Sequence, residues 1–156
     1  DALVILGDGP LLPQCEALTR DAPNIALPGA KANVADYLHL ADCFVSASHA
    51  EGLPNAVLEA LACSLPVLLS DIPAHREILA LSSAAGELFS IDRPESLNEA
   101  IQNFEITNDR RAAARALAME HFSAEAMSRS YQELYRQQLA AVAAKTRSGN
   151  DVDHLA

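Results

Sequence analysis

Two glutamates, Glu51 and Glu59, are the residues of this sequence whose type and spacing could do chemistry. An ionised glutamate only accepts hydrogen bonds, and its two oxygens can take two hydroxyl groups of a polyol. Between them lies a tight turn, followed by a predicted helix whose free amides and dipole favour an anion at its N-terminus. Hydroxyl groups beside an anion indicate a nucleotide or a nucleotide sugar as ligand.

A buried strand and a helix must position these two carboxylates. The apolar residues 43–45 feed the turn, and parallel-sheet proteins use this arrangement to aim a helix N-terminus at a ligand. Pro54 has no N–H group and suits the first helical turn, so we expect the amides of Asn55, Ala56 and Val57 to be the donors. Gly52 is expected to relieve steric crowding in the turn.

Strand and helix patterns alternate along the chain, which predicts the α/β class. We expect one Rossmann-like parallel sheet of about five strands, flanked by helices and followed by C-terminal helices. The strands are predicted at residues 2–6, 24–27, 43–47, 66–69 and 86–91. The helices are predicted at 12–20, 34–41, from the turn to 63, and at 74–80, 94–104, 109–121 and 124–145. Residues 1–145 are expected to form one domain, and 146–156 a flexible tail.

The stretch from Glu51 to Glu59, with Gly-Leu-Pro-Asn inside it, resembles the donor-site signature of the retaining family 4 glycosyltransferases. Residues 5–10, 27–29, 65–73 and 76–78 resemble the same family in the same order. The resemblance covers roughly residues 1–125 and implies the C-terminal, donor-binding half of a GT-B fold. It implies that Glu51 lies at the transferred sugar as the catalytic residue and that Glu59 accepts from the ribose. The other donor-binding residues implied at this turn and helix are Gly52, Leu53, Asn55, Ala56 and Val57.

A second segment of the donor site is implied at residues 28–31. Pro28, Gly29, Ala30 and Lys31 follow a predicted strand end, at the sheet edge where open α/β proteins bind ligands. The family uses this loop, largely through its backbone, to hold the base of the nucleotide. Lys31 could add a contact to the base or a phosphate, and a solvated loop lysine is the alternative. Residues 7–9 are expected to form a tight strand-to-helix turn rather than a phosphate site.

The resemblance implies transfer of a sugar, with retention, from a nucleotide sugar to an unidentified acceptor. A UDP- or GDP-sugar is the expected donor, with no metal and no other cofactor. Relative to the family, the chain starts one strand and one helix late, without the Arg and Lys that clamp the pyrophosphate and without an acceptor domain. We therefore expect part of a longer enzyme, inactive alone. The alternative is a non-catalytic module that binds nucleotide sugars or protein partners.

Two residues depart from the family pattern. His75 stands where the family often has a glycine close to the donor. Ser64 replaces a frequent glycine after the signature helix, so it must either adopt or avoid a left-handed helix cap.

Composition limits the other classes of function. The net charge is −10 over 156 residues, which argues against a nucleic-acid surface. No uncharged apolar run approaches the length of a transmembrane helix. We expect a cytoplasmic location, with contact to the inner face of the membrane as an alternative. The three cysteines have no metal-site spacing and are expected to be structural. The apolar face of the last helix, 124–145, is expected to invite self-association.

Overall fold

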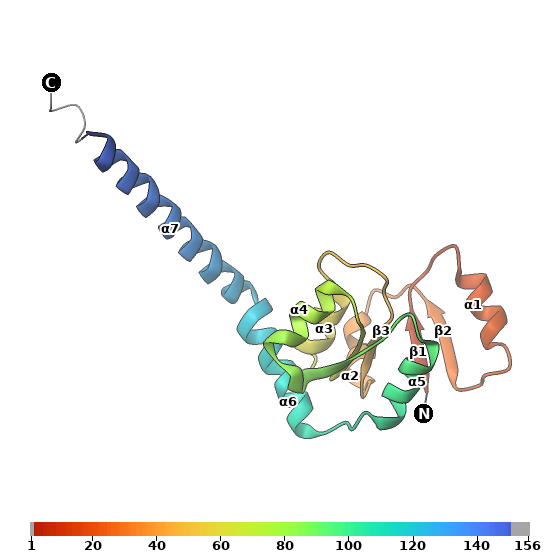
Figure 1. Ribbon diagram of the computed structural model, residues 1–156. Coiled ribbons are helices and arrows are strands. Elements are labelled where there is room, and N and C mark those ends of the chain that lie inside the picture. Colours follow the sequence, from red (N-terminus) through yellow and green to blue (C-terminus); the bar gives the residue numbers. More distant parts are fainter. Residues whose placement is uncertain (1, 151–156) are drawn as a thin grey trace. The chain divides into compact units, whose positions relative to one another are not determined.

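The computed structural model describes residues 2–150, whose path is drawn in Figure 1. The chain forms two compact units, residues 1–41 and residues 42–156. All strand pairs are parallel, and helices follow the strands in both units. The α/β class predicted from the alternating pattern is therefore confirmed. The five strands form two sheets rather than one, with β1 and β2 in the first and β3, β4 and β5 in the second.

The first unit contains a two-stranded parallel sheet and two helices. Its elements are β1 (Leu3–Leu6), α1 (Leu12–Thr19), β2 (Ile25–Gly29) and α2 (Val34–Leu40). The turn between β1 and α1 is tight, as expected, because Gly7 has a φ of +132° and the Asp8 carboxylate accepts from the Gly9 amide at 2.8 Å.

The end of β2 differs from the sequence prediction, which broke the strand at Pro28. The strand instead continues through Pro28 to Gly29. Proline is tolerated because it lies where the register of β1 and β2 shifts, between the Val4–Ala26 and Leu6–Gly29 pairs, and the regular ladder of hydrogen bonds is interrupted there. Gly29 ends the strand with a φ of +74°, a left-handed conformation that glycine adopts readily.

The second unit contains a three-stranded sheet in the order β3-β4-β5. The strands are β3 (Phe44–Ser46), β4 (Val67–Ser70) and β5 (Gly86–Phe89). Val67 of the central strand lies opposite Phe44 on one side and Gly86 on the other. All of β4 is buried, which is typical of a parallel strand covered on both faces.

The second unit also contains helices and two short helical turns, and Figure 1 labels the helices. They are α3 (Asn55–Ala62), α4 (Pro73–Leu81), a 3₁₀ turn η1 (Ser83–Ala85), α5 (Pro94–Asn103), α6 (Asn108–Leu117), a π turn η2 (Ala118–Phe122) and α7 (Ala124–Asn150). Helix α3 packs against β3, β4 and α6, while α4 and α5 contact β5. The core of the unit is built from aliphatic side chains of these elements, among them Val57, Leu61, Leu69 and Leu117.

Three arginines of α6 fasten the sheet and α3 together. Arg110 bonds Glu87 of β5 at 2.5 Å, and Arg111 bonds Asp42 ahead of β3 at 2.9 Å. Arg115 donates to the carbonyl oxygen of Ala62 in the last turn of α3. A cation at this end also complements the helix dipole. Helix α6 thereby fixes the direction of α3, the helix that carries Glu59.

The C-terminal end of α3 shows which of the two conformations considered for Ser64 occurs. Ser64 adopts the left-handed conformation with a φ of +64°. The Leu65 amide donates to the Ala60 carbonyl and the Ser64 amide to the Leu61 carbonyl, which is the Schellman pattern. A serine thus occupies the position that glycine usually takes, at a cost in backbone strain.

The end of the chain also differs from expectation. Helix α7 continues to Asn150 and so takes in residues 146–150 of the segment predicted as a tail. Residues 151–156, the rest of that predicted tail, lie outside the described residues.

Candidate active site

The turn after β3 holds the Glu51 carboxylate in an exposed position. The hydroxyl of Ser48 donates to Oε1 of Glu51 at 2.8 Å, and the hydroxyls of Ser46 and Ser48 lie 3.3 Å apart. One carboxylate oxygen is therefore oriented by the turn itself. The second oxygen has no hydrogen-bond partner within the described chain and can accept from a ligand.

Gly52 does not play the role that the sequence suggested. A Cβ atom built at Gly52 would meet nothing within 4 Å, and the residue does not have a left-handed φ. The turn is therefore not crowded at this position. Space beside Gly52 remains open for a ligand.

The N-terminus of α3 offers fewer free amides than predicted. The Asn55 amide donates to the Leu53 carbonyl at 2.9 Å, and the Val57 amide donates to the Pro54 carbonyl at 2.9 Å. Val57 is also buried. Of the three expected donors, only the amide of Ala56 is without a hydrogen bond within residues 2–150.

Glu59 lies on the exposed face of α3, opposite the buried Val57 and Leu61. Helical spacing puts its side chain on the same face as Asn55 and Ala56. Within the described chain the Glu59 carboxylate has no hydrogen-bond or ion-pair partner. Both of its oxygens are available to hydroxyl groups.

The end of β4 is tied directly to the turn that carries Glu51. Ser70, the last residue of β4, is fully buried, and its hydroxyl donates to the Ser48 carbonyl at 2.6 Å. His75 in the first turn of α4 is also fully buried, with Nδ1 2.9 Å from the Ser70 carbonyl oxygen. The carboxyl ends of two neighbouring strands are thereby joined at one edge of the sheet.

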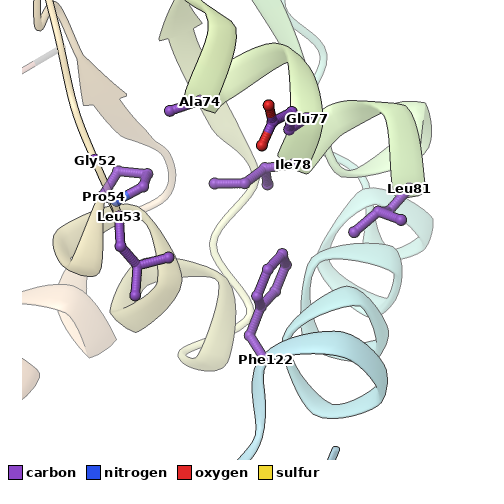
Figure 2. Close-up of a pocket in the computed structure, with 8 residues that line it drawn as sticks. All are labelled: Gly52, Leu53, Pro54, Ala74, Glu77, Ile78, Leu81 and Phe122. Carbon is purple, nitrogen blue, oxygen red and sulfur yellow. The ribbon is translucent and has the colours of Figure 1, made fainter. Parts of the chain in front are cut away.

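A pocket of about 290 Å³ adjoins this edge, and Figure 2 shows the side chains arranged around it. Gly52, Leu53 and Pro54 line it from the turn, while Ala74, Glu77, Ile78 and Leu81 come from α4 and Phe122 from η2. Its lining is apolar except for Glu77, an exposed carboxylate with no partner within the described chain. The pocket offers one hydrogen-bond acceptor and an apolar floor.

Sequence reasoning missed several of these residues. Ser48 could have been found, because a serine three residues before a glutamate in a turn can bond its carboxylate. Ser70, Leu81 and Phe122 gave no such local signal, since their places depend on how β4, α4 and η2 pack. Pro28, Gly29, Ala30 and Lys31 belong to the first unit, where Ala30 and Lys31 are exposed.

Potential metal ligands and cysteine thiols occur in several elements of the described chain. No group of three or more His, Cys, Asp or Glu side chains within residues 2–150 could hold a metal ion. None of the three cysteines forms a disulfide within the described residues, and all three are half-buried. Burial raises the pKa of the Cys43 thiol from its ordinary 9.0 to about 11, which keeps it protonated and unreactive at neutral pH.

None of the helices within the described residues is sufficiently long and apolar to cross a membrane.

Known proteins with similar sequences and folds point in one direction. The uncharacterized glycosyltransferase MJ1059 of Methanocaldococcus jannaschii is 42% identical over 81 residues, which is 49% of this chain and 20% of that protein. Sucrose-phosphate synthase from Thermosynechococcus elongatus matches with a TM-score of 0.72 at 23% identity, over 89% of this chain and 39% of that one. HepE of Anabaena, solved with UDP and glucose, matches with a TM-score of 0.70 at 18% identity, over 86% of this chain and 40% of that one.

The chain therefore spans less than half the length of each of these proteins. The two solved structures show the fold, which is that of part of a GT-B glycosyltransferase. The family model for group 1 glycosyl transferases matches residues 1–105. This match covers more than half of the chain, and the chain therefore belongs to the group 1 glycosyl transferases.

Proposed function

We propose that this chain is the nucleotide-sugar-binding part of a retaining, family 4 glycosyltransferase. The observation that carries the proposal is Glu51, an exposed carboxylate oriented by Ser48 at the carboxyl edge of a parallel sheet, in a chain of this family. Open α/β sheets bind their ligands beyond this edge. Because the chain covers only part of its relatives, the activity and the acceptor of the whole protein belong to the proposal as well.

Glu51 has the charge that the transfer requires. Retaining transfer separates a sugar that develops positive charge from a nucleotide phosphate that develops negative charge. In the proposed mechanism Glu51 accepts from the sugar hydroxyls and stabilises the positive charge, while the leaving phosphate takes the proton of the acceptor. The free Ala56 amide and the N-terminus of α3 stabilise the negative charge on the phosphate.

Glu59 accepts from the ribose hydroxyls in this proposal. Its exposure and its two unoccupied oxygens on the face of Asn55 and Ala56 support that role. Gly52 and Leu53 border the pocket next to Glu51, which supports contact with the donor. The role of residues 28–31 in holding the base stays a prediction.

The donor to test first is a UDP-sugar, since HepE was solved with UDP and glucose. Ligand-observed NMR of the chain with UDP, GDP, ADP and UDP-glucose measures which nucleotide binds. The same spectra of Glu59→Ala are expected to lose the signal of that nucleotide. Glu16→Ala is the matched control, because Glu16 is another exposed helical glutamate, on α1.

The outcomes separate the candidate functions. Binding of one nucleotide that is lost in Glu59→Ala and kept in Glu16→Ala supports the proposal. Binding that survives Glu59→Ala excludes the ribose role of Glu59. Nucleotide-sugar binding by the chain, with no transfer to any acceptor by the whole protein that contains it, favours the alternative, a non-catalytic binding module. No binding of any nucleotide at millimolar concentration contradicts the proposal.

Self-association through α7 is a further part of the proposal. Large apolar side chains on this helix are exposed, with Tyr131 at 54%, Leu139 at 70% and Val142 at 61%. Exposed apolar surface of this kind favours association. Light scattering is expected to give a molar mass above that of a single chain, and the mass is expected to fall to that of a monomer in Leu139→Glu. A monomeric mass for the unchanged protein contradicts self-association. A cytoplasmic location likewise stays a proposal.

A further inference from the structure

His75 has no solvent contact, with 0% of its surface exposed. Its Nδ1 atom lies 2.9 Å from the carbonyl oxygen of Ser70 and 3.2 Å from the Ser70 hydroxyl oxygen. Its Nε2 atom is buried and has no hydrogen-bond partner within the described residues. A buried imidazole with one nitrogen engaged and one free is costly, so its contacts call for a physical reason.

The direction of each hydrogen bond follows from the partners. The Ser70 hydroxyl has one proton, and that proton is donated to the carbonyl oxygen of Ser48 at 2.6 Å. The Ser70 hydroxyl can then only accept from His75, and the Ser70 carbonyl oxygen also only accepts. Both contacts therefore require a proton on Nδ1 of His75. The neutral ring consequently carries its proton on Nδ1 and a lone pair on Nε2.

These hydrogen bonds link His75 to Glu51 through two serines, with the backbone and the hydroxyl of Ser48 each making one of the bonds. His75 donates to Ser70, Ser70 donates to the Ser48 carbonyl, and the Ser48 hydroxyl donates to the Glu51 carboxylate at 2.8 Å. His75 also fixes the hydroxyl rotor of Ser70, because a donor on one side of that oxygen leaves its proton free to point at Ser48. The links connect α4 and β4 to the turn after β3.

We infer that His75 is a positioning residue for Glu51, acting through Ser70 and Ser48. The inference rests on the proposed function for the role of Glu51 at the sugar, but the positioning itself does not. His75 touches neither Glu51 nor the pocket beside it, and it acts by keeping Ser48 in place. Residues 49–51 are exposed, and no backbone amide of residues 47–52 donates a hydrogen bond within the described residues, so a buried anchor for this turn matters.

The test compares three substitutions at the start of the chain of hydrogen bonds. His75→Leu removes the donor, whereas His75→Asn keeps an N–H group close to the place of Nδ1. Ser70→Ala removes the hydroxyl link alone. This smaller change is expected to keep the fold, so it still tests the inference if His75→Leu fails to fold. Leu79→Ala is the matched control, because Leu79 is a buried residue of the same helix outside these hydrogen bonds.

The first readout is the NMR order parameters of the backbone amides of residues 47–53 in the absence of any ligand. His75→Leu and Ser70→Ala are expected to lower them toward values below about 0.6, which are typical of flexible backbone, because the turn loses its link to the buried end of β4. His75→Asn is expected to restore most of the order. Leu79→Ala is expected to change the order parameters of α4 more than those of residues 47–53. Equal order parameters of residues 47–53 in Ser70→Ala and the unchanged protein overturn the inference, as do equal values in His75→Leu and His75→Asn.

The second readout is affinity for the nucleotide sugar that the unchanged chain binds. The affinity is expected to fall about 3- to 10-fold in His75→Leu and to recover in His75→Asn. An affinity for the sugar donor that is unchanged in His75→Leu overturns the link to Glu51. If the unchanged chain binds no nucleotide sugar, the proposed function fails, and the order parameters of residues 47–53 still decide whether His75 holds the turn.

Discussion

Arg76 of α4 grips the carboxylate of Asp71 with two parallel hydrogen bonds, from Nε at 2.5 Å and from Nη2 at 2.9 Å. Asp71 directly follows β4, and Arg76 lies one residue after the buried His75. The planar guanidinium fits a carboxylate in this two-pronged way, which a lysine cannot do. The pair closes the turn from β4 into α4 on its outer side, while His75 and Ser70 close it on the inner side.

The pair predicts a depressed pKa for Asp71. The hydrogen bonds from Arg76 hold the pKa of the Asp71 carboxyl below its usual 3.8, because they favour the charged form. This contribution to stability is present above pH 3.8 and is lost as the pH falls through the lower folded-state pKa. An NMR titration of the Asp71 carboxyl carbon measures it. Arg76→Gln is expected to return the pKa to its usual range, and an unchanged titration in that variant contradicts the assignment.

The backbone conformation of Ser64 predicts that glycine at this position stabilises the protein. Its φ of +64° is strained for serine and relaxed for glycine, although glycine also makes the unfolded chain more flexible. Ser64→Gly is therefore expected to raise the free energy of unfolding by about 0.5 to 1 kcal/mol. Ser64→Val is expected to lower it, because a β-branched side chain tolerates this conformation poorly. Urea unfolding measures both changes, provided that the dependence of the free energy of unfolding on urea concentration is the same in all variants. A loss of stability in Ser64→Gly contradicts the strain assigned to Ser64.

The surroundings of Gly86 and Gly52 predict that substitution by alanine lowers the free energy of unfolding at the first position and hardly changes it at the second. A Cβ atom on Gly86 would lie 2.1 Å from the Val67 carbonyl oxygen, so β4 and β5 would have to part. Gly86→Ala is expected to cost about 2 to 3 kcal/mol. Gly52→Ala has open space and is expected to stay within about 0.5 kcal/mol of the unchanged protein. Urea unfolding of both variants gives the comparison, and a similar loss in the two contradicts it.

Gly52→Ala also separates stability from binding. In the proposed function Gly52 lies at the donor, so the variant is expected to weaken nucleotide-sugar binding while its midpoint of unfolding stays unchanged. Unaltered affinity for the nucleotide sugar would remove Gly52 from the donor site.

The burial of Cys43 predicts that its thiol is alkylated slowly. Burial raises its pKa to about 11, two units above the ordinary 9.0, so about 100-fold less thiolate is present at pH 8. Iodoacetamide is expected to label Cys43 about 100-fold more slowly in the folded protein than in urea, and the folded rate is expected to keep rising up to about pH 11. Mass spectrometry of the labelled peptides measures each site. Equal rates for Cys43 in the folded and unfolded protein exclude the shift.

The sequence by itself predicted the strands and the turn that carries Glu51. Apolar runs between Gly and Pro turns predicted all five strands to within a few residues, because strand and helix periodicity is written in local sequence. It also located the turn of Glu51, but it left open whether Ser64 adopts or avoids the left-handed conformation that the structure shows. Those features depend on neighbours within a few residues, which a sequence displays directly.

The tertiary structure decided which distant residues meet. The division of five strands into two sheets could not be read from the pattern, because it depends on which strands pair. Ser70 reaches Ser48 across 22 residues and Arg111 reaches Asp42 across 69, because strand pairing and helix packing bring them together. His75 was read as a departure from a glycine pattern, and only packing revealed that it is fully buried against Ser70. Hydrogen bonds of this range depend on the three-dimensional path of the chain, so local sequence carries no signal for them.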